Sequence, residues 1–291
     1  MDTVPTINDR LAPGDIHLLL ERHCGIKAVE LLRLKSEDHM VYRFGVEGRD
    51  DLVIKIAGEG KQREKKIVRE IKTIQKLKDI VSVPNILKYG KKPRPFFIMP
   101  CYKNDQNVTY GHFLMNWMDH IEKLSGHKST RACPPALYKV LSLIHHWFRL
   151  YSLERDSQLR EFFPGIEQVR NRLREIIMSD EVLTGQPRPG EMIFAAKNPR
   201  VVDWSEGFRK CLFHQQLAFI TFYKVIKDPV NRIKETEMLL KTRAVNQHIP
   251  DLGMLKTWWK IIAITDGLFL FRKYQSAKFL ETFSGYYRSF D

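Results

Sequence analysis

Three strand-like segments followed directly by one amphipathic helix are the feature that most constrains the fold of this chain. The segments lie within residues 28–34, 41–46 and 52–57. Two polar stretches, KSEDH and EGRDD, separate them and are typical of hairpin connections. We therefore expect a three-stranded antiparallel meander over residues 28–57.

The third strand and the helix after it each direct one charged residue toward their common interface. Lys55 shares a strand face with small apolar neighbours, and a covered lysine requires an anionic partner because an unpaired buried charge is costly. Residues 61–78 are predicted to form a helix, and Glu70 falls within its apolar stripe. We expect a Lys55–Glu70 ion pair between strand and helix. The alternative is that Glu70 pairs with Lys66, one turn earlier on the same helix.

The remainder of the chain is predicted to be mostly helical. A short helix is expected over 13–23 and a short strand over Phe96–Met99, ending at Pro100. The later helices are predicted over residues 112–124, 136–153, 166–178, 209–226, 234–244 and 255–274. This order predicts an α+β protein, with a small antiparallel sheet lobe at residues 1–102 and a larger, mainly helical lobe at 103–291.

Residues 183–207 interrupt the helical lobe with a predicted strand–turn–strand unit, the hairpin 183–206. Asn198-Pro199 is a turn signal between two short apolar runs. The second run delivers Asp203 at its end, where a carboxylate could hold a metal ion at the edge of a cleft. The alternative is that Asp203 caps a turn or a helix.

Composition limits the cellular setting of the chain. The 291 residues carry a net charge of +14, and 43% of them are hydrophobic, as in a globular protein with a substantial core. The four cysteines have no CxxC spacing, which argues against a disulfide framework or a zinc site. The apolar window Leu252–Phe271 contains charged residues, so we expect it to form a buried helix and not a membrane span. No signal peptide is visible, so we expect a cytoplasmic location.

The order of these pieces resembles the aminoglycoside phosphotransferase and choline kinase-like branch of the protein kinase-like fold. The matching pieces are VYRFGV, LVIKIA, REIKTIQKL, VPNILKYG, FFIMPCY and LTGQPRPGEMIF…VVDW. Together they extend over most of residues 28–220. The resemblance implies a two-lobed kinase-like fold and a phosphotransferase that uses ATP and Mg²⁺.

The same resemblance implies a nucleotide site in the sheet lobe. Lys55 would bind the α- and β-phosphates, and Glu70 would orient it. The strand from Phe97 through Met99 to Cys101 would lie against the adenine. Phosphoryl transfer depends mainly on positioning and on neutralising charge, which is why a cation on the phosphates is needed.

The predicted catalytic loop departs from the pattern of the family. Asp203 would hold Mg²⁺, but Gln186 stands where the family has its catalytic aspartate, and glutamine cannot accept a proton at neutral pH. Loss of a general base costs about 10²- to 10⁴-fold in rate. Glu191 replaces an asparagine and is an oxygen ligand suited to Mg²⁺, while Gln216 replaces another aspartate. A shifted register, in which Asp180 or Glu191 takes the role of the base, remains open.

The histidines and tryptophans that stand out in the sequence do not indicate a metal or nucleotide site. His145 and His146 are adjacent on a predicted helix, so their side chains point about 100° apart and do not share a metal ion. His214 is expected to be a satisfied core residue, and Trp258 and Trp259 are expected to pack in the core.

Three function classes follow. The first is an ATP- and Mg²⁺-dependent phosphotransferase acting on a small hydroxyl- or amine-bearing molecule. The second is a pseudokinase that binds nucleotide weakly or not at all and acts as an interaction module for a protein partner, motivated by Gln186, Glu191 and Gln216. The third, a nucleic-acid-binding protein, is motivated by charge alone, and the absence of a binding motif beside the basic helix 61–78 argues against it. Basic residues around the hairpin could attract an anionic substrate; they are Arg188, Lys197 and Arg200.

Overall fold

The computed structural model divides the chain into two compact units, each described here by itself. One unit comprises Met1–Gln106 and Gly190–Phe208, and the other comprises Asn107–Pro189 and Arg209–Asp291. The residues that the structure describes are 11–34, 36, 39–103, 108–125, 135–178, 186–187, 192–195, 198–201, 208–209, 213–242 and 251–291.

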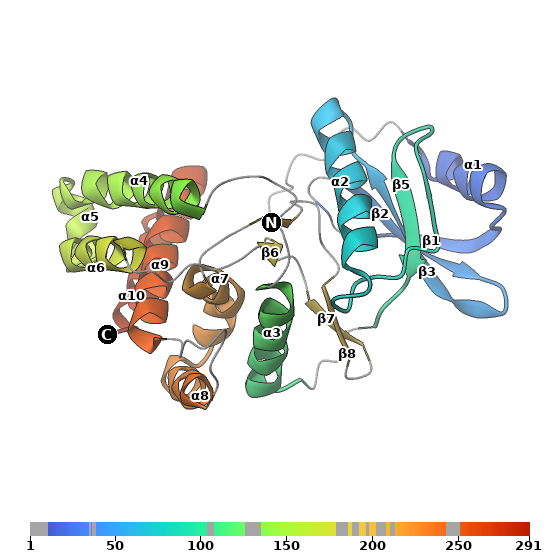
Figure 1. Cartoon of the computed structure of the whole chain (residues 1–291). Coiled ribbons are helices and arrows are strands. Elements are labelled where there is room, and N and C mark those ends of the chain that lie inside the picture. Colours follow the sequence, from blue (N-terminus) through green and yellow to red (C-terminus); the bar gives the residue numbers. More distant parts are fainter. Residues whose placement is uncertain are drawn as a thin grey trace. The chain divides into compact units, whose positions relative to one another are not determined.

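The first unit is built around a five-stranded antiparallel sheet with the strand order β1-β2-β3-β5-β4 (Figure 1). Its strands are β1 (Ala28–Leu34), β2 (His39–Val46), β3 (Arg49–Ala57), β4 (Lys88–Gly90) and β5 (Phe96–Pro100). The expected meander over residues 28–57 is confirmed, and β5 adds to its free edge at β3.

Two helices, α1 (Pro13–Cys24) and α2 (Lys61–Leu77), cover opposite faces of this sheet (Figure 1). The strand alternation decides which face receives which helix. Ile54 and Ile56 point into the cluster under α1, where both are fully buried. Lys55 therefore points to the other face, toward α2.

The hairpin of β7 (Met192–Ala195) and β8 (Asn198–Val201) belongs to the first unit by its contacts. We had expected this segment to lie within the helical lobe at residues 103–291. The predicted turn at Asn198-Pro199 is wrong, because both residues lie in β8, where Ala195 pairs with Asn198 and Phe194 with Pro199. A proline is tolerated there because β8 has a single partner strand in this sheet and can leave one backbone position unbonded.

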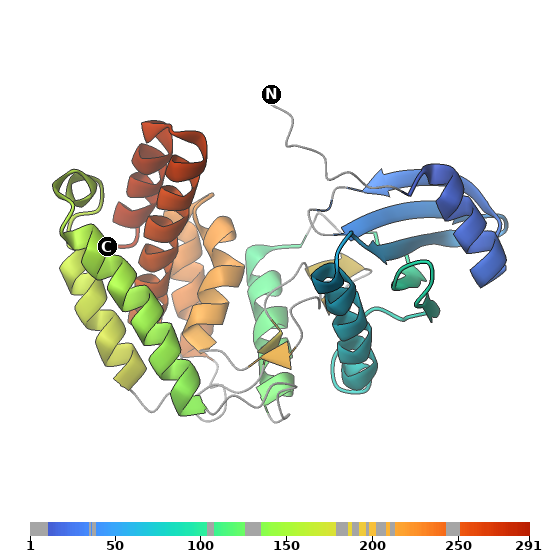
Figure 2. The same ribbon diagram turned by 90° about the horizontal axis from the view of Figure 1, so that it is seen from above.

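The second unit is mainly helical (Figure 2). Its helices are α3 (Tyr110–Ser125), α4 (Pro135–Glu154), α5 (Ser157–Phe162), α6 (Ile166–Met178), α7 (Phe213–Val225), α8 (Pro229–Lys241), α9 (Leu252–Tyr274) and α10 (Ala277–Arg288). A short pairing joins β6 (Gln186–Pro187) to β9 (Phe208–Arg209). The helix expected over 209–226 therefore begins later, at Phe213.

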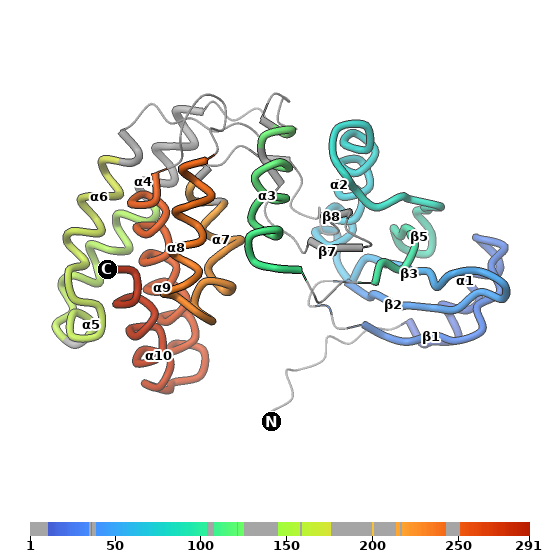
Figure 3. Tube along the Cα trace, turned by 90° about the horizontal axis from the view of Figure 1, so that it is seen from below, coloured from blue at the N-terminus to red at the C-terminus, as the bar shows by residue number. Residues whose placement is uncertain are grey.

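Helix α9 is the centre of the second unit. It packs against α10, α7 and α6, and Figure 3 shows α9 and α10 side by side. Trp258 and Trp259 are fully buried in its core, as the sequence predicted. The Trp259 Nε1–H donates a hydrogen bond to Thr221 Oγ1 at 2.9 Å, which satisfies its polar atom. Within the described part of the chain, no helix is long and apolar enough to cross a membrane.

Candidate functional site

Lys55 and Glu70 form a buried ion pair between β3 and α2. Lys55 Nζ lies 3.0 Å from Glu70 Oε1 and 2.9 Å from Oε2. The Lys55 side chain is 11% exposed and the Glu70 side chain 0%, so water screens the pair little. The predicted contact between strand and helix is confirmed. Strand alternation and the apolar stripe of the helix carried enough information to find it.

The register of the sheet places an apolar surface beside Lys55. Directly opposed residues on neighbouring strands share a face. Lys55 is opposite Val41 on one side and Phe97 on the other. Two residues along β3, Val53 is opposite Met99. Val53, Phe97 and Met99 are all buried, so the ammonium group is next to a mainly apolar floor.

The end of β5 is held by backbone and ionic contacts. The Cys101 N–H donates to Asp51 O at 2.8 Å, and Arg43 Nε pairs with Asp51 Oδ2 at 2.8 Å. Burial raises the pKa of the Cys101 thiol, while the Arg43 charge acts in the opposite direction. The thiol therefore stays protonated at neutral pH, and Cys101 contributes a small, largely apolar side chain at this end of the sheet face.

Arg200 ties the β7–β8 hairpin to the segments that flank β4 and β5, a contact that the sequence analysis missed. Its Nη1 donates to Val83 O at 3.3 Å and to Tyr102 Oη at 3.4 Å, and its guanidinium lies 4.8 Å from the centroid of the Tyr102 ring. Tyr102 Oη in turn accepts a hydrogen bond from Asn85 N at 3.0 Å. These contacts give Arg200 a structural role, and the attraction of an anionic substrate stays a prediction.

The residues proposed for metal binding and base catalysis are not tested by the structure. Asp203 and Glu191 lie outside the described residues. Gln186 lies in β6 and Gln216 in α7, and only the backbone is described at these two positions. Within the residues that are described, no three His, Cys, Asp or Glu side chains cluster in a way that could hold a metal ion.

The histidines singled out in the sequence have structural surroundings. His214 is buried, and its Nε2 accepts a hydrogen bond from Asp251 N at 2.9 Å, as expected for a satisfied core residue. The His146 ring packs edge-on against Trp258, with 5.4 Å between centroids, and lies 3.4 Å from Gln215 Nε2. Burial lowers the pKa of His146 to about 4, with the charges of His145 and Arg149 acting in the same direction.

Comparison with known proteins finds similarity at the level of structure. No family model and no curated protein matches the sequence. Among solved structures, a choline kinase from Streptococcus pneumoniae has a TM-score of 0.60 at 12% identity, covering 94% of this chain and 97% of its own. An amicoumacin kinase in complex with AMP-PNP, Ca²⁺ and its antibiotic has a TM-score of 0.58 at 12% identity, covering 95% and 93%.

A third similar structure is an aminoglycoside phosphotransferase in a ternary complex with AMP-PNP and hygromycin B. It has a TM-score of 0.56 at 15% identity, covering 96% of this chain and 99% of its own. The chain therefore has the two-lobed kinase-like fold that these small-molecule phosphotransferases share, with an antiparallel sheet unit and a mainly helical unit. The expected fold class is confirmed, and the predicted resemblance holds at the level of the fold.

Proposed function

We propose that this protein is a phosphotransferase that uses ATP and Mg²⁺ to phosphorylate a small hydroxyl- or amine-bearing molecule. The observation that carries the proposal is the buried Lys55–Glu70 ion pair on an otherwise apolar sheet face. A desolvated ion pair is at best a weak source of stability, since burying both charges costs about as much as their attraction returns. Its presence in this position is better explained by a ligand that needs a fixed ammonium group.

In this proposal, Lys55 contacts the α- and β-phosphates of the nucleotide, and Glu70 holds the ammonium in place. The apolar floor formed by Val53 and Met99 offers a surface for the adenine ring. The Cys101 amide already donates to a backbone carbonyl, so the adenine edge would be recognised by the residues that follow Cys101.

Asp203 and Glu191 would hold Mg²⁺. Both supply carboxylate oxygens, the ligand type that Mg²⁺ prefers, and the bound ion would neutralise charge on the phosphates. Gln186 would orient the acceptor hydroxyl or amine by hydrogen bonding without removing its proton, which predicts slow turnover. An enzyme that depends on ATP in this way would work in the cytoplasm.

A second candidate function is that of a pseudokinase, a protein-interaction module that binds nucleotide without turning it over. Three departures from the family pattern favour it: Gln186 cannot act as a base, Glu191 replaces an asparagine, and Gln216 replaces an aspartate. The two candidates share the site around Lys55 and differ in whether chemistry follows binding.

The experiment that separates them combines thermal stabilisation with single-turnover kinetics. The melting temperature is measured with ATP, with and without Mg²⁺, and ATP consumption is then followed with a panel of aminoglycosides, macrolides and choline. Stabilisation together with acceptor-dependent ADP formation supports the phosphotransferase. Stabilisation without turnover for any acceptor supports the pseudokinase, and no stabilisation by ATP contradicts both.

A further inference from the structure

A pocket between α4 and α9 of the helical unit has an unusual set of polar groups. Its volume is about 330 Å³, close to the lower end of the range for small-molecule sites. Leu153 and Leu268 supply apolar surface to its wall. The polar residues that line it are His145, Arg149, Ser152 and Arg272. None of the described residues that line the pocket is acidic, so this lining includes two cations and no anion to balance them.

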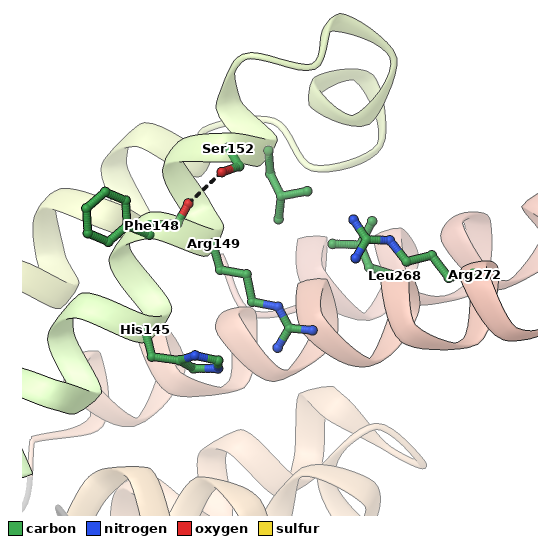
Figure 4. A pocket seen from close by; sticks show the side chains of 7 residues that line it. His145, Phe148, Arg149, Ser152, Leu268 and Arg272 are labelled. Atoms are coloured by element: carbon green, nitrogen blue, oxygen red, sulfur yellow. Dashed lines mark hydrogen bonds between the residues drawn. The ribbon is translucent and has the colours of Figure 1, made fainter.

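The helix spacing brings these groups together. His145, Arg149 and Ser152 follow one another at intervals of four and three residues, so they lie along one face of α4. Leu268 and Arg272 are one turn apart on α9. Figure 4 shows Arg149 extending from α4 toward α9, and Arg272 running back along α9 toward Leu268. Both guanidinium groups therefore border the same space.

Neither guanidinium group has a full partner in the part of the chain that the structure describes. No hydrogen bond or close ion pair is formed there by the side chain of Arg149 or Arg272. The carboxylate that interacts electrostatically with Arg149 is Asp266, and it already accepts a hydrogen bond from Tyr223 Oη at 2.6 Å. Even if Asp266 compensates Arg149 fully, the charge of Arg272 remains.

The pKa of His146, next to the pocket residue His145, is lowered in part by the same positive charges. Burial is the main cause that lowers the pKa of this imidazole to about 4, and the nearby charges of His145 and Arg149 act in the same direction. A second cation is thus disfavoured here, whereas an anion would be favoured. Arginine is suited to that ligand, because its planar fork binds phosphate and carboxylate oxygens with two parallel hydrogen bonds.

We propose that this pocket binds a small oxyanion, of the phosphate-ester or carboxylate class, between Arg149 and Arg272. The volume exceeds that of one such group, so the ligand has room for a second anionic group or a short organic part. Ser152 also lines the pocket, but its hydroxyl already donates to Phe148 O at 2.9 Å, so the two arginines supply the donors for the ligand (Figure 4). The pocket is built by residues of α4 and α9 only, so the proposal stands apart from the nucleotide site proposed around Lys55.

The test uses pyrophosphate and citrate as probes, titrated calorimetrically at constant ionic strength. The titrations are done on the wild-type chain and on a Lys55→Met, Glu70→Leu variant, which removes binding at the proposed nucleotide site. At least one probe is expected to bind both proteins, and the added substitutions Arg149→Gln and Arg272→Gln should weaken that binding at least tenfold. A preference for pyrophosphate or for citrate tells a phosphate ligand from a carboxylate ligand.

The matched control removes two exposed cations elsewhere on the helical unit, with Arg174→Gln on α6 and Lys278→Gln on α10, and should leave the affinity within twofold. A second variant, Ser152→Glu, places a carboxylate in the lining of the pocket that both arginines share. It should raise the melting temperature without any probe and abolish the response to the probe. Equal affinity in the Arg149/Arg272 variant and the control, or no binding of either probe to the wild-type chain, would overturn the proposal.

Discussion

Lys55 and Glu70 stabilise each other only while both are present. Removing one partner takes the 2.9 and 3.0 Å contacts away from the other buried charge, which costs about 3–5 kcal/mol, whereas replacing both by apolar residues of similar volume is close to neutral. The pair can therefore be separated into its contribution to folding and its contribution to function.

We predict that Lys55→Met alone lowers the free energy of unfolding by about 3–5 kcal/mol. The double variant Lys55→Met, Glu70→Leu should recover most of this loss, because no buried charge remains. Urea denaturation of the wild-type, single and double variants measures the coupling as a double-mutant cycle. Additive losses in the double variant would contradict the coupling that the 2.9 and 3.0 Å contacts imply.

Gln186 is the second residue at which a single substitution is decisive. If it occupies the position of the catalytic base, Gln186→Asp should raise the single-turnover rate by about 10²-fold or more, because a general base contributes 10²- to 10⁴-fold. Gln186→Asn is the matched control, since it shortens the side chain without adding a base. Equal rates in the two variants would place the base elsewhere, for example at Asp180 or Glu191.

At the scale of helices, the close approach of α9 and α10 depends on Gly267. A Cβ atom at this position would lie 2.8 Å from Phe283 Cβ and 3.2 Å from its Cγ, which is too close for either helix to accept without moving. Gly285 is also within a helix, α10, but a Cβ there meets nothing within 4 Å.

We therefore predict opposite effects for the same substitution at these two glycines. Gly267→Ala should destabilise the protein by about 1–3 kcal/mol through overpacking. Gly285→Ala should stabilise it by about 0.5–1 kcal/mol, because alanine favours the helix and no contact is strained. Thermal unfolding measures both. Stabilisation by Gly267→Ala would show that α9 and α10 are not packed at this distance.

The elements that sequence could predict are those specified by local periodicity. The strand alternation around Lys55 and the apolar stripe containing Glu70 fixed their common interface, because both signals are contained in short windows. Helix α10 was not anticipated. Its order depends on Leu280, Phe283 and Tyr287 packing in the core of the helical unit, which a window of sequence does not reveal.

The same limit applies to the site. Arg200 reaches Val83 and Tyr102, which are 117 and 98 residues away, so no local pattern indicated that it fastens the hairpin to the sheet unit. The turn was misplaced at Asn198-Pro199 because these residue types favour turns by composition, whereas the pairing of Phe194 with Pro199 decided the register. Contacts between distant segments therefore fix the role of Arg200, whereas the pairing within the hairpin fixes the position of the turn.

For the molecule as a whole, acid should lower stability through two buried histidines. Burial lowers the pKa of both His120 and His146 to about 4, from a reference of 6.5. The unfolded chain therefore binds more protons than the folded chain between these pH values, and stability falls as the pH decreases from 6.5 toward 4. Each histidine contributes at most about 1.4 kcal/mol per pH unit in this window.

We predict that the free energy of unfolding of the wild-type chain declines across this window, and that His120→Gln combined with His146→Gln flattens the decline. Urea titrations at pH 7.0, 5.5 and 4.5 give the comparison. His23→Gln, in α1, is the control, because this residue is exposed and its substitution should leave the slope unchanged. An unchanged slope in the double variant would mean that other groups govern the acid response.

The central claim is that the sheet unit presents Lys55 to a nucleotide. The most direct measurement is the equilibrium dissociation constant of ATP with Mg²⁺ for the wild-type chain and for Lys55→Met, Glu70→Leu, which keeps the fold but removes the ammonium group. The account predicts that the wild-type chain binds ATP and that the double variant binds at least tenfold more weakly. Equal affinity of the two proteins, or no binding by the wild-type chain, would contradict it.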